Sequence, residues 1–356
     1  MHYHIILTKE CNLNCSYCGG GSDSPPKEIQ YSISDLKSFL SRDEAPAIEF
    51  YGGEPLLRIE TMKKIMDAVP GRYVIQTNGL FLDRIEPQYL KKFHSILVSI
   101  DGKKDVTDRN RGEGVYDRVM RNIKLIRQNG FSGDLVARMT VPQGTDIYEN
   151  VLHLAECGAF DHIHWQLGFE MFWEGAEPGL EEWIQSYNTD ISLLVGWWIE
   201  EMERTHHVPG IVPFTGVMNS LLNGTQSRLR CGSGIDFFAV MPDGRISACP
   251  VSIDFDFSVV GSISDTPVSL CNRVLVGEPC ISCDIFHICG GRCLFVNHAQ
   301  DMLRKNGYAL ICSTVRHLAQ ELEAAAPLIR ELIDSRVIEK DALYYPEFNN
   351  GCEIIP

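Results

Sequence analysis

Short apolar runs rich in β-branched residues alternate with amphipathic helical patterns through the first half of the chain. Such alternation predicts an α/β fold in which parallel strands are joined by right-handed helical crossovers. The expected strands are His4–Thr8, Ala47–Tyr51, Arg72–Gln76, Ser95–Ile100, Leu135–Val141 and His162–Phe169. The expected helices are Ser34–Leu40, Ile59–Val69, Gln88–Phe93, Tyr116–Gln128 and Ile147–Cys157. Six strands rather than eight indicate a partial (β/α)6 TIM-type barrel, with functional groups at the carboxyl ends of its strands.

The second half of the chain has a different pattern. Residues Pro178 to Arg204 read as one long helix, and Ser313 to about Ile338 as a final amphipathic helix. Between them, Phe237–Met241 and Arg245–Cys249 flank the turn residues Pro242-Asp243-Gly244, which predicts a β-hairpin. The predicted parts are the barrel (1–175), a helical bridge (176–228), a small cysteine-rich α+β domain with the hairpin (229–312), and a C-terminal helix with a tail (313–356).

The number of cysteines and the charge narrow the class of protein. Thirteen cysteines among 356 residues exceed what packing needs, and the N-terminus lacks the features of an export signal. We therefore expect a cytoplasmic protein whose clustered thiols bind metal rather than form disulfides. No apolar run approaches the length of a membrane span. The net charge of −15 disfavours nucleic acid as a partner, so we expect neither a membrane nor a nucleic acid.

Three cysteines, Cys11, Cys15 and Cys18, follow the first expected strand with the spacing C-x3-C-x2-C. Three thiolates on one short loop can bind three irons of a 4Fe–4S cluster and leave the fourth iron open. A zinc site would need a fourth ligand nearby, for which His2 and His4 on the preceding strand are candidates. Inert thiols are the remaining alternative, and the triplet alone leaves all three open.

The triplet resembles the signature of radical S-adenosylmethionine (SAM) enzymes, and further motifs agree with it. Each of three follows an expected strand, and a fourth comes shortly after. They are Gly52-Gly53-Glu54-Pro55, Gln76-Thr77-Asn78-Gly79, Ser99-Ile100-Asp101-Gly102 and Asp108-Arg109-Asn110-Arg111. Turn chemistry alone would explain Asn78-Gly79 or Asp101-Gly102. It does not explain the whole set in this order.

This resemblance implies a cofactor and a radical reaction. SAM would chelate the open iron, and reductive cleavage would give methionine and a 5′-deoxyadenosyl radical that abstracts a substrate hydrogen. By similarity, Ser99 and Arg111 would hold the SAM carboxylate, and the Gly-Gly-Glu-Pro element would meet its amino group. The expected SAM contacts are Tyr17, Gly52, Gly53, Glu54, Pro55, Asn78, Ser99 and Arg111. Alternate residues of the last two strands are expected to line a polar barrel interior or, alternatively, a solvated edge. These are Arg138, Thr140, His162, His164 and Gln166.

A second set of cysteines begins with Cys231, Gly244 and Cys249 in the spacing C-x12-G-x4-C. It continues as C-x2-C-x5-C-x3-C and ends with Cys312 after eighteen more residues. In every spacing this resembles the SPASM extension of radical SAM enzymes, which implies two auxiliary 4Fe–4S clusters and three clusters in all. By the family pattern the first auxiliary cluster takes Cys231, Cys249 and Cys293, and the second takes Cys280, Cys283, Cys289 and Cys312. A zinc ribbon is the alternative.

The first auxiliary cluster lacks its fourth ligand in this pattern, because residues 223–230 contain no cysteine. Cys271 or Cys352 could reach back to close it, or both could be inert. Alternatively, the open iron could bind a substrate thiolate. The third unassigned cysteine, Cys157, ends an apolar helix face and is expected in the core.

The resemblance implies a peptide or protein substrate. Ribosomal-peptide maturases, which install thioether or carbon–carbon crosslinks, fit best, with a ribosomal precursor peptide as partner, ferredoxin or flavodoxin as electron donor, and anaerobic conditions. In sulfatase-maturing enzymes an aspartate follows the cysteine equivalent to Cys249, whereas Pro250 stands here. A radical SAM enzyme of small-molecule or cofactor biosynthesis would share every motif, and a non-enzymatic zinc scaffold is the last alternative. Because the chain starts at the first expected strand, leader recognition is expected from another polypeptide or from the tail after Cys312.

Overall fold

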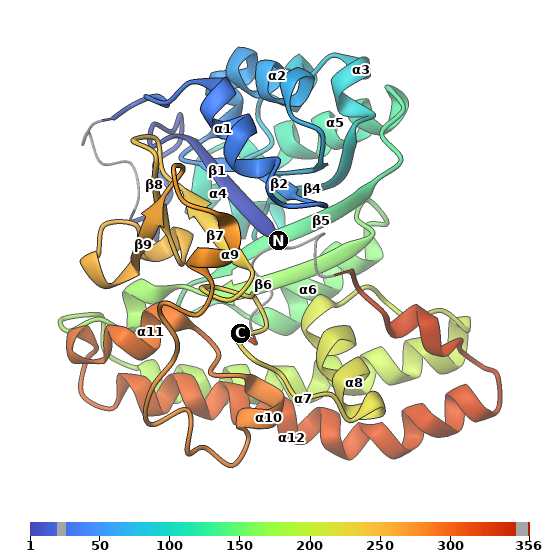
Figure 1. The fold of residues 1–356 in the computed structure, drawn as a ribbon. Helices are drawn as coiled ribbons and strands as arrows, with labels where there is room; N and C mark the ends of the chain where they lie inside the picture. Colours follow the sequence, from blue (N-terminus) through green and yellow to red (C-terminus); the bar gives the residue numbers. More distant parts are fainter. Residues whose placement is uncertain (20–25, 347–354) are drawn as a thin grey trace.

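A nine-stranded sheet in the order β6-β5-β4-β3-β2-β1-β7-β8-β9 forms the centre of the computed structural model, which describes residues 1–19, 26–346 and 355–356 (Figure 1). Its first six strands are parallel and follow one another in chain order. They are β1 (His2–Thr8), β2 (Ala47–Gly52), β3 (Arg72–Thr77), β4 (Phe93–Ser99), β5 (Asp134–Val141) and β6 (His162–Leu167). The predicted partial barrel is confirmed.

Helices connect these strands on the outer face of the sheet (Figure 1). They are α1 (Ile33–Leu40), α2 (Ile59–Ala68), α3 (Pro87–Leu90), α4 (Lys104–Arg111), α5 (Val115–Gln128) and α6 (Ile147–Glu156). The helix expected to reach Phe93 is wrong at its end, because Phe93 is buried in the core as the first residue of β4. Helix α4 was not predicted, since Val106 is its one aliphatic side chain and no apolar period marks it.

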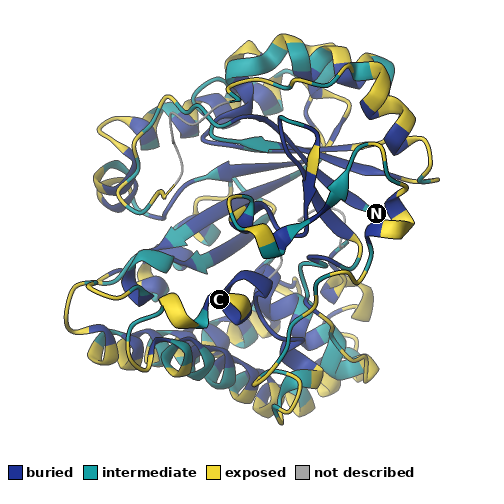
Figure 2. Cartoon of the chain, turned by 60° about the vertical axis from the view of Figure 1, so that its left-hand side comes forward, coloured by how far each residue is buried: buried dark blue, intermediate teal, exposed yellow. Residues whose placement is uncertain are grey.

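The two faces of the barrel sheet differ in chemistry, although both are buried (Figure 2). Residues such as Ile5, Phe50 and Val98 belong to the main hydrophobic core under the helices. On the opposite face, a small separate cluster is formed by Val74, Leu97 and Val136. The register places buried polar residues on that same inner face: His4 opposite Glu49, and Arg138 opposite His164. The interior of the barrel is therefore lined in large part by polar side chains.

The predicted hairpin does not stand apart from the barrel. Strand β7 (Phe237–Val240) pairs in parallel with β1, so the hairpin with β8 (Arg245–Ser247) extends the barrel sheet. A third antiparallel strand, β9 (Val259–Ser262), follows and was not predicted. The cysteine-rich segment beyond it contains the short helices α9 (Pro267–Leu270), α10 (Phe286–Cys289) and α11 (Leu294–His298).

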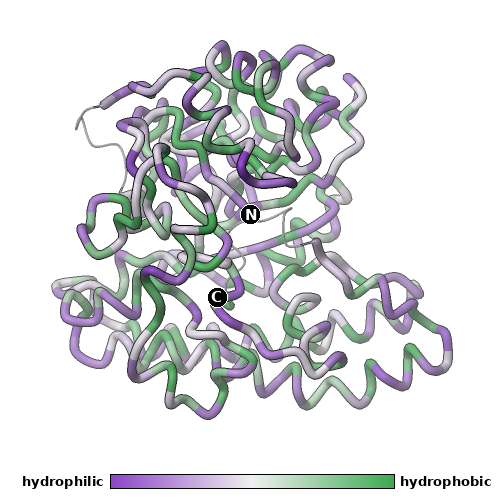
Figure 3. The backbone as a smooth tube through the Cα atoms, viewed as in Figure 1, coloured by the Kyte–Doolittle hydropathy of each residue, from purple (hydrophilic) through white to green (hydrophobic). Residues whose placement is uncertain are grey.

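Three longer helices form a layer beyond β6 (Figure 1). They are α7 (Leu180–Thr205), α8 (Val212–Asn223) and α12 (Gly307–Asp334). Apolar and polar residues alternate along them (Figure 3), and Phe214 of α8 packs edge-to-face on both Trp165 of β6 and Trp198 of α7. Helix α12 begins at Gly307 rather than at Ser313, which brings Cys312 into the helix. None of the described helices is both long and apolar enough to cross a bilayer.

Candidate active site and cysteine clusters

The first three cysteines lie on the loop that leaves the carboxyl end of β1. Cys11 and Cys15 are half-buried and Cys18 is exposed. The backbone N–H of Ser16 donates to the carbonyl of Asn110 in α4 at 2.9 Å, and the N–H of Cys18 donates to the carbonyl of Cys15 at 3.0 Å. The loop is thereby held against α4 with its thiols toward the end of the barrel strands.

The two glycines after β2 allow the closest backbone approach in this region. The N–H of Gly53 donates to the Thr8 carbonyl at 2.9 Å, and the N–H of Glu54 donates to the Glu10 carbonyl at 2.8 Å. A Cβ atom at Gly52 would lie 2.1 Å from the Thr8 oxygen, and one at Gly53 2.2 Å from the Glu10 oxygen. Glycine is thus required here so that β2 can dock on the cysteine loop.

The carboxylate of Glu54 joins three parts of the site. Its Oε1 accepts hydrogen bonds from the Leu56 N–H at 2.9 Å and from Thr77 Oγ1 at 2.8 Å, and its Oε2 accepts one from the Asn78 N–H at 2.8 Å. Burial raises the pKa of Glu54 to about 7, while these donors act in the opposite direction. Asn78 in turn donates through Nδ2 to Asn12 Oδ1 at 2.9 Å, which ties the end of β3 to the cysteine loop.

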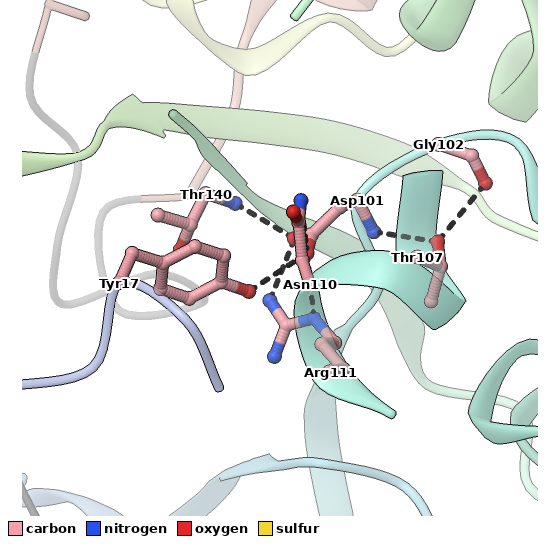
Figure 4. A network of polar contacts seen from close by, with 7 residues as sticks. All are labelled: Tyr17, Asp101, Gly102, Thr107, Asn110, Arg111 and Thr140. Carbon is pink, nitrogen blue, oxygen red and sulfur yellow. Dashed lines mark hydrogen bonds and ion pairs between the residues drawn. The ribbon is translucent and has the colours of Figure 1, made fainter. Parts of the chain in front are cut away.

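Asp101, just beyond β4, is the centre of a buried polar network (Figure 4). Its two oxygens accept from Arg111 Nε at 3.0 Å and Nη2 at 2.7 Å. Tyr17 on the cysteine loop donates its hydroxyl to Oδ2 at 2.7 Å, and the backbone N–H of Thr140 in β5 donates to Oδ1 at 3.0 Å. Asp101 thus joins the cysteine loop, α4 and β5. Asp101 stands in one of the four family-like motifs, but its role in this network could not be assigned from the sequence.

The network brings a cation to the cysteine loop. The guanidinium of Arg111 is buried and lies 5.5 Å from the centre of the Tyr17 ring. Burial raises the pKa of the Cys15 thiol, and the charge of Arg111 opposes that rise. Ser99, the other residue expected near a carboxylate, is the half-buried last residue of β4. The expected SAM contacts lie on the loop after β1, at the carboxyl ends of β2, β3 and β4, and on α4.

Five later cysteines line one cavity of about 510 Å³: the four expected to share one cluster, Cys280, Cys283, Cys289 and Cys312, and also Cys293. Hydrogen-bond donors surround their sulfurs. The Tyr308 hydroxyl lies 2.9 Å from Cys280 Sγ, and Asn297 Nδ2 donates to the same sulfur at 3.5 Å. Arg316 Nη2 donates to Cys283 Sγ at 3.2 Å. Donors aimed at sulfur are what metal-bound thiolates need from the surrounding protein, so this cavity fits an iron–sulfur cluster.

The remaining SPASM-like cysteines, Cys231, Cys249 and Cys293, influence one another electrostatically. Burial raises the pKa of Cys231 to about 11 and of Cys249 to about 12. Such thiols ionise at neutral pH only when a metal holds the thiolate. Cys271 is half-buried, and its Sγ contacts the Pro267 carbonyl at 3.7 Å, with Asp236 as an electrostatic neighbour.

The other two unassigned cysteines are placed differently. The prediction that Cys157 is a core residue is wrong: it is exposed, because it is the C-cap of α6, where its Sγ donates to the Leu154 carbonyl at 3.1 Å. Cys352 lies outside the described residues.

The polar interior of the barrel contains a second set of buried ionisable groups. Glu49 Oε2 lies 2.8 Å from His2 Nε2 and 2.7 Å from His4 Nε2. These histidines therefore contact Glu49 rather than the cysteine loop, where a zinc site would have needed them. Arg138 Nη1 lies 2.8 Å from His164 Nδ1 on the same inner face. Glu49 was missed because its role depends on the pairing of β1 with β2.

Comparison with known proteins agrees with this geometry. The Radical SAM superfamily model matches residues 5–156. An uncharacterized protein of Archaeoglobus fulgidus is 26% identical over 89% of this chain and 79% of its own length. Mycofactocin maturase MftC of Mycolicibacterium smegmatis is 25% identical over 81% of this chain and 76% of its own length.

Solved structures share the fold beyond the barrel. The structure of anSMEcpe with bound AdoMet has a TM-score of 0.75 and 21% sequence identity, covering 95% of this chain and 100% of that one. The structure of Streptococcus suis SuiB bound to precursor peptide SuiA has a TM-score of 0.57 and 17% identity, covering 84% and 72%. Both sequence identities are low, so these two matches show a shared fold and nothing about function. Residues 5–156 are a radical SAM domain, the kind of domain that binds SAM and a 4Fe–4S cluster, and the chain that contains it is an enzyme.

Proposed function

We propose that the chain is a SPASM-type radical SAM maturase that installs a thioether or carbon–carbon crosslink in a ribosomally made peptide. The observation that best supports the radical chemistry is the Asp101 network, which holds the cysteine loop, α4 and β5 in one arrangement. When bound, the 4Fe–4S cluster and SAM supply a 5′-deoxyadenosyl radical that removes a hydrogen atom from the substrate. An anaerobic electron donor such as ferredoxin or flavodoxin would supply the electron.

The proposed roles of the residues follow from their places. Cys11, Cys15 and Cys18 hold the cluster, and Arg111 with Ser99 binds the SAM carboxylate. Asp101 fixes two of the guanidinium nitrogens of Arg111, so the arginine is presented in one orientation. The amino group of SAM is placed at the Gly52-Gly53-Glu54-Pro55 turn, and Tyr17 and Asn78 complete the site.

The cysteines of the second half are proposed to hold two auxiliary 4Fe–4S clusters. One set is Cys280, Cys283, Cys289 and Cys312, which line one cavity. The other set is Cys231, Cys249 and Cys293, of which Cys293 lines the same cavity. After anaerobic reconstitution we expect about twelve iron and twelve labile sulfide per chain, measured by colorimetric assay. Wild-type protein holding only about four irons would contradict the auxiliary clusters and leave the radical SAM domain standing.

The peptide substrate is supported by the similarity to mycofactocin maturase MftC over most of the chain. Pro250, the first residue of a short helical turn after Cys249, stands where the sulfatase-type enzymes have an aspartate, so this position lacks an acid–base group. The test is coexpression of the chain with each short open reading frame that flanks its gene, followed by mass spectrometry. A crosslinked product lacks two hydrogen atoms, and a deuterated peptide should pass deuterium to 5′-deoxyadenosine. Unmodified peptides without deuterium transfer would contradict the proposal.

The first auxiliary cluster is proposed to keep one iron open to a substrate thiolate. Within the described residues, the hydrogen bond of Cys271 Sγ goes to the Pro267 carbonyl, at 3.7 Å, on its own short helix α9. We therefore expect Cys271→Ser, and likewise Cys352→Ser, to leave the iron content and the auxiliary-cluster EPR signal unchanged. A cysteine-containing peptide should perturb that signal, and its serine analogue should not. Loss of iron in either variant would show that the site is closed by a protein thiolate.

A further inference from the structure

Arg292 is a buried cation for which the described residues provide no hydrogen-bond partner. It lies between Cys289 and Cys293 in the chain, lines the 510 Å³ cavity and is 5% exposed. Its Nε, Nη1 and Nη2 atoms are all buried and make no hydrogen bond within the described part of the chain. Its guanidinium makes a cation–π contact with Phe169, and the centre of that ring lies 5.8 Å from the guanidinium carbon.

Both the buried charge of Arg292 and its backbone conformation are energetically unfavourable. A buried charge without a counter-charge is strongly unfavourable, since neither water nor a carboxylate stabilises it. Asp284, the one carboxylate among the residues that line the cavity, is already paired with Arg316. The backbone at Arg292 has a φ of 49°, a left-handed conformation that residues other than glycine rarely adopt. An arginine in this position implies an anion within the cavity.

The charge of Arg292 reaches cysteines of both proposed auxiliary sets. Arg292 lines the same cavity as Cys289 and Cys312 from one set and Cys293 from the other. By contrast, the buried arginine near the first cysteine loop, Arg111, is neutralised by Asp101. The two buried arginines therefore differ: Arg111 is paired with a carboxylate, whereas the described residues provide no paired carboxylate for Arg292.

We propose that Arg292 is the shared counter-cation of the two auxiliary clusters and that it raises their reduction potentials. This rests on the auxiliary clusters proposed above. Reduction adds a negative charge to a cluster, so a fixed positive charge and N–H donors beside its sulfurs favour the reduced form. Burial strengthens the effect, because little water screens the interaction. Arg292 acts through the clusters and is a positioning residue rather than a catalytic one.

The test compares Arg292→Gln, which removes the charge, with Arg292→Lys, which keeps it. Arg273→Gln is the matched control, since Arg273 belongs to the same cysteine-rich segment but donates to the carbonyls of Ser269 and Val260. The midpoint potential of each cluster is measured by EPR-monitored redox titration of the reconstituted full chain. We expect Arg292→Gln to lower the reduced-to-oxidised ratio of the auxiliary clusters at least tenfold at a fixed potential, about 59 mV for one electron. Arg292→Lys should retain most of the wild-type potential, and Arg273→Gln all of it.

Iron content separates the outcomes. If Arg292→Gln holds wild-type iron and its potentials are unchanged, the proposal is overturned. If Arg292→Gln loses auxiliary iron and Arg292→Lys keeps it, the requirement for charge is supported. If both variants lose iron equally, the residue acts through packing and the proposal fails. The iron content of the wild-type protein is measured before any variant is made. If it lacks auxiliary iron, the proposal of auxiliary clusters is itself contradicted.

Discussion

A variant with Cys11, Cys15 and Cys18 all changed to alanine is expected to release no 5′-deoxyadenosine from SAM under reducing conditions. These thiols are the proposed ligands of the one cluster that meets SAM, so their removal should also lower the iron content by about four per chain. The fold should persist, because Cys18 is exposed and the loop is held by backbone bonds such as that from Ser16 to Asn110. Chromatography of the nucleoside and circular dichroism measure the two effects.

The matched control is Cys157→Ala, which removes an exposed thiol at the end of α6, far along the chain from the cysteine loop. It should release 5′-deoxyadenosine at the wild-type rate. If the triple variant still forms 5′-deoxyadenosine, the radical-generating cluster lies elsewhere. The two auxiliary sets of cysteines would then be the next candidates for its ligands.

Asp101→Ala is expected to give the largest loss of stability, about 3–5 kcal/mol in the free energy of unfolding. The change leaves the buried guanidinium of Arg111 without its carboxylate and the Tyr17 hydroxyl and Thr140 N–H without their acceptor. Breaking one side of a buried pair costs more than the pair contributes, because the remaining charge stays desolvated. Denaturant unfolding followed by circular dichroism measures the loss.

Asp117→Ala is the control, since Asp117 forms an ion pair with Lys104 at the surface of the same region. Exposed pairs contribute at most about 1 kcal/mol, so this variant should unfold close to wild type. Equal unfolding free energies for the Asp101 and Asp117 variants would mean that the network does not hold the cysteine loop in place. SAM affinity should fall in the Asp101 variant alone, because Arg111 loses its fixed orientation.

The strands of the barrel could be predicted from their short runs rich in apolar and β-branched residues, which pack in the core under the helices. The same reasoning failed for α4, whose polar residues form the wall of the site, and for β9, a strand of four residues that includes Gly261. Cys157 was misplaced because an apolar helix face does not tell whether its last residue extends past the neighbouring strand. The two sets of cysteines could be recognised from the sequence, because the spacing between neighbouring cysteines is a local feature of the chain.

Other roles could not be read from the sequence because they depend on partners that are distant in the chain. Asp101 acquires its function from Tyr17 on one side and Thr140 on the other. Glu49 depends on the pairing of β1 with β2. Arg292 is unusual because the fold buries its guanidinium where the described residues offer it no hydrogen bond. An arginine next to a cysteine in a sequence is more often a solvated surface residue.

The pairing of β7 with β1 has a consequence for how the molecule assembles. Strand β1 lies between β2, its near neighbour in the chain, and β7, which begins only at Phe237. During synthesis, one edge of β1 must therefore stay without its partner until two thirds of the polypeptide has emerged, and such pairing over long separations is slow. An open strand edge is prone to pair with other chains. We expect loading of the first cysteine loop with iron to compete with aggregation in the cell, and shortened chains that end before β7 to precipitate.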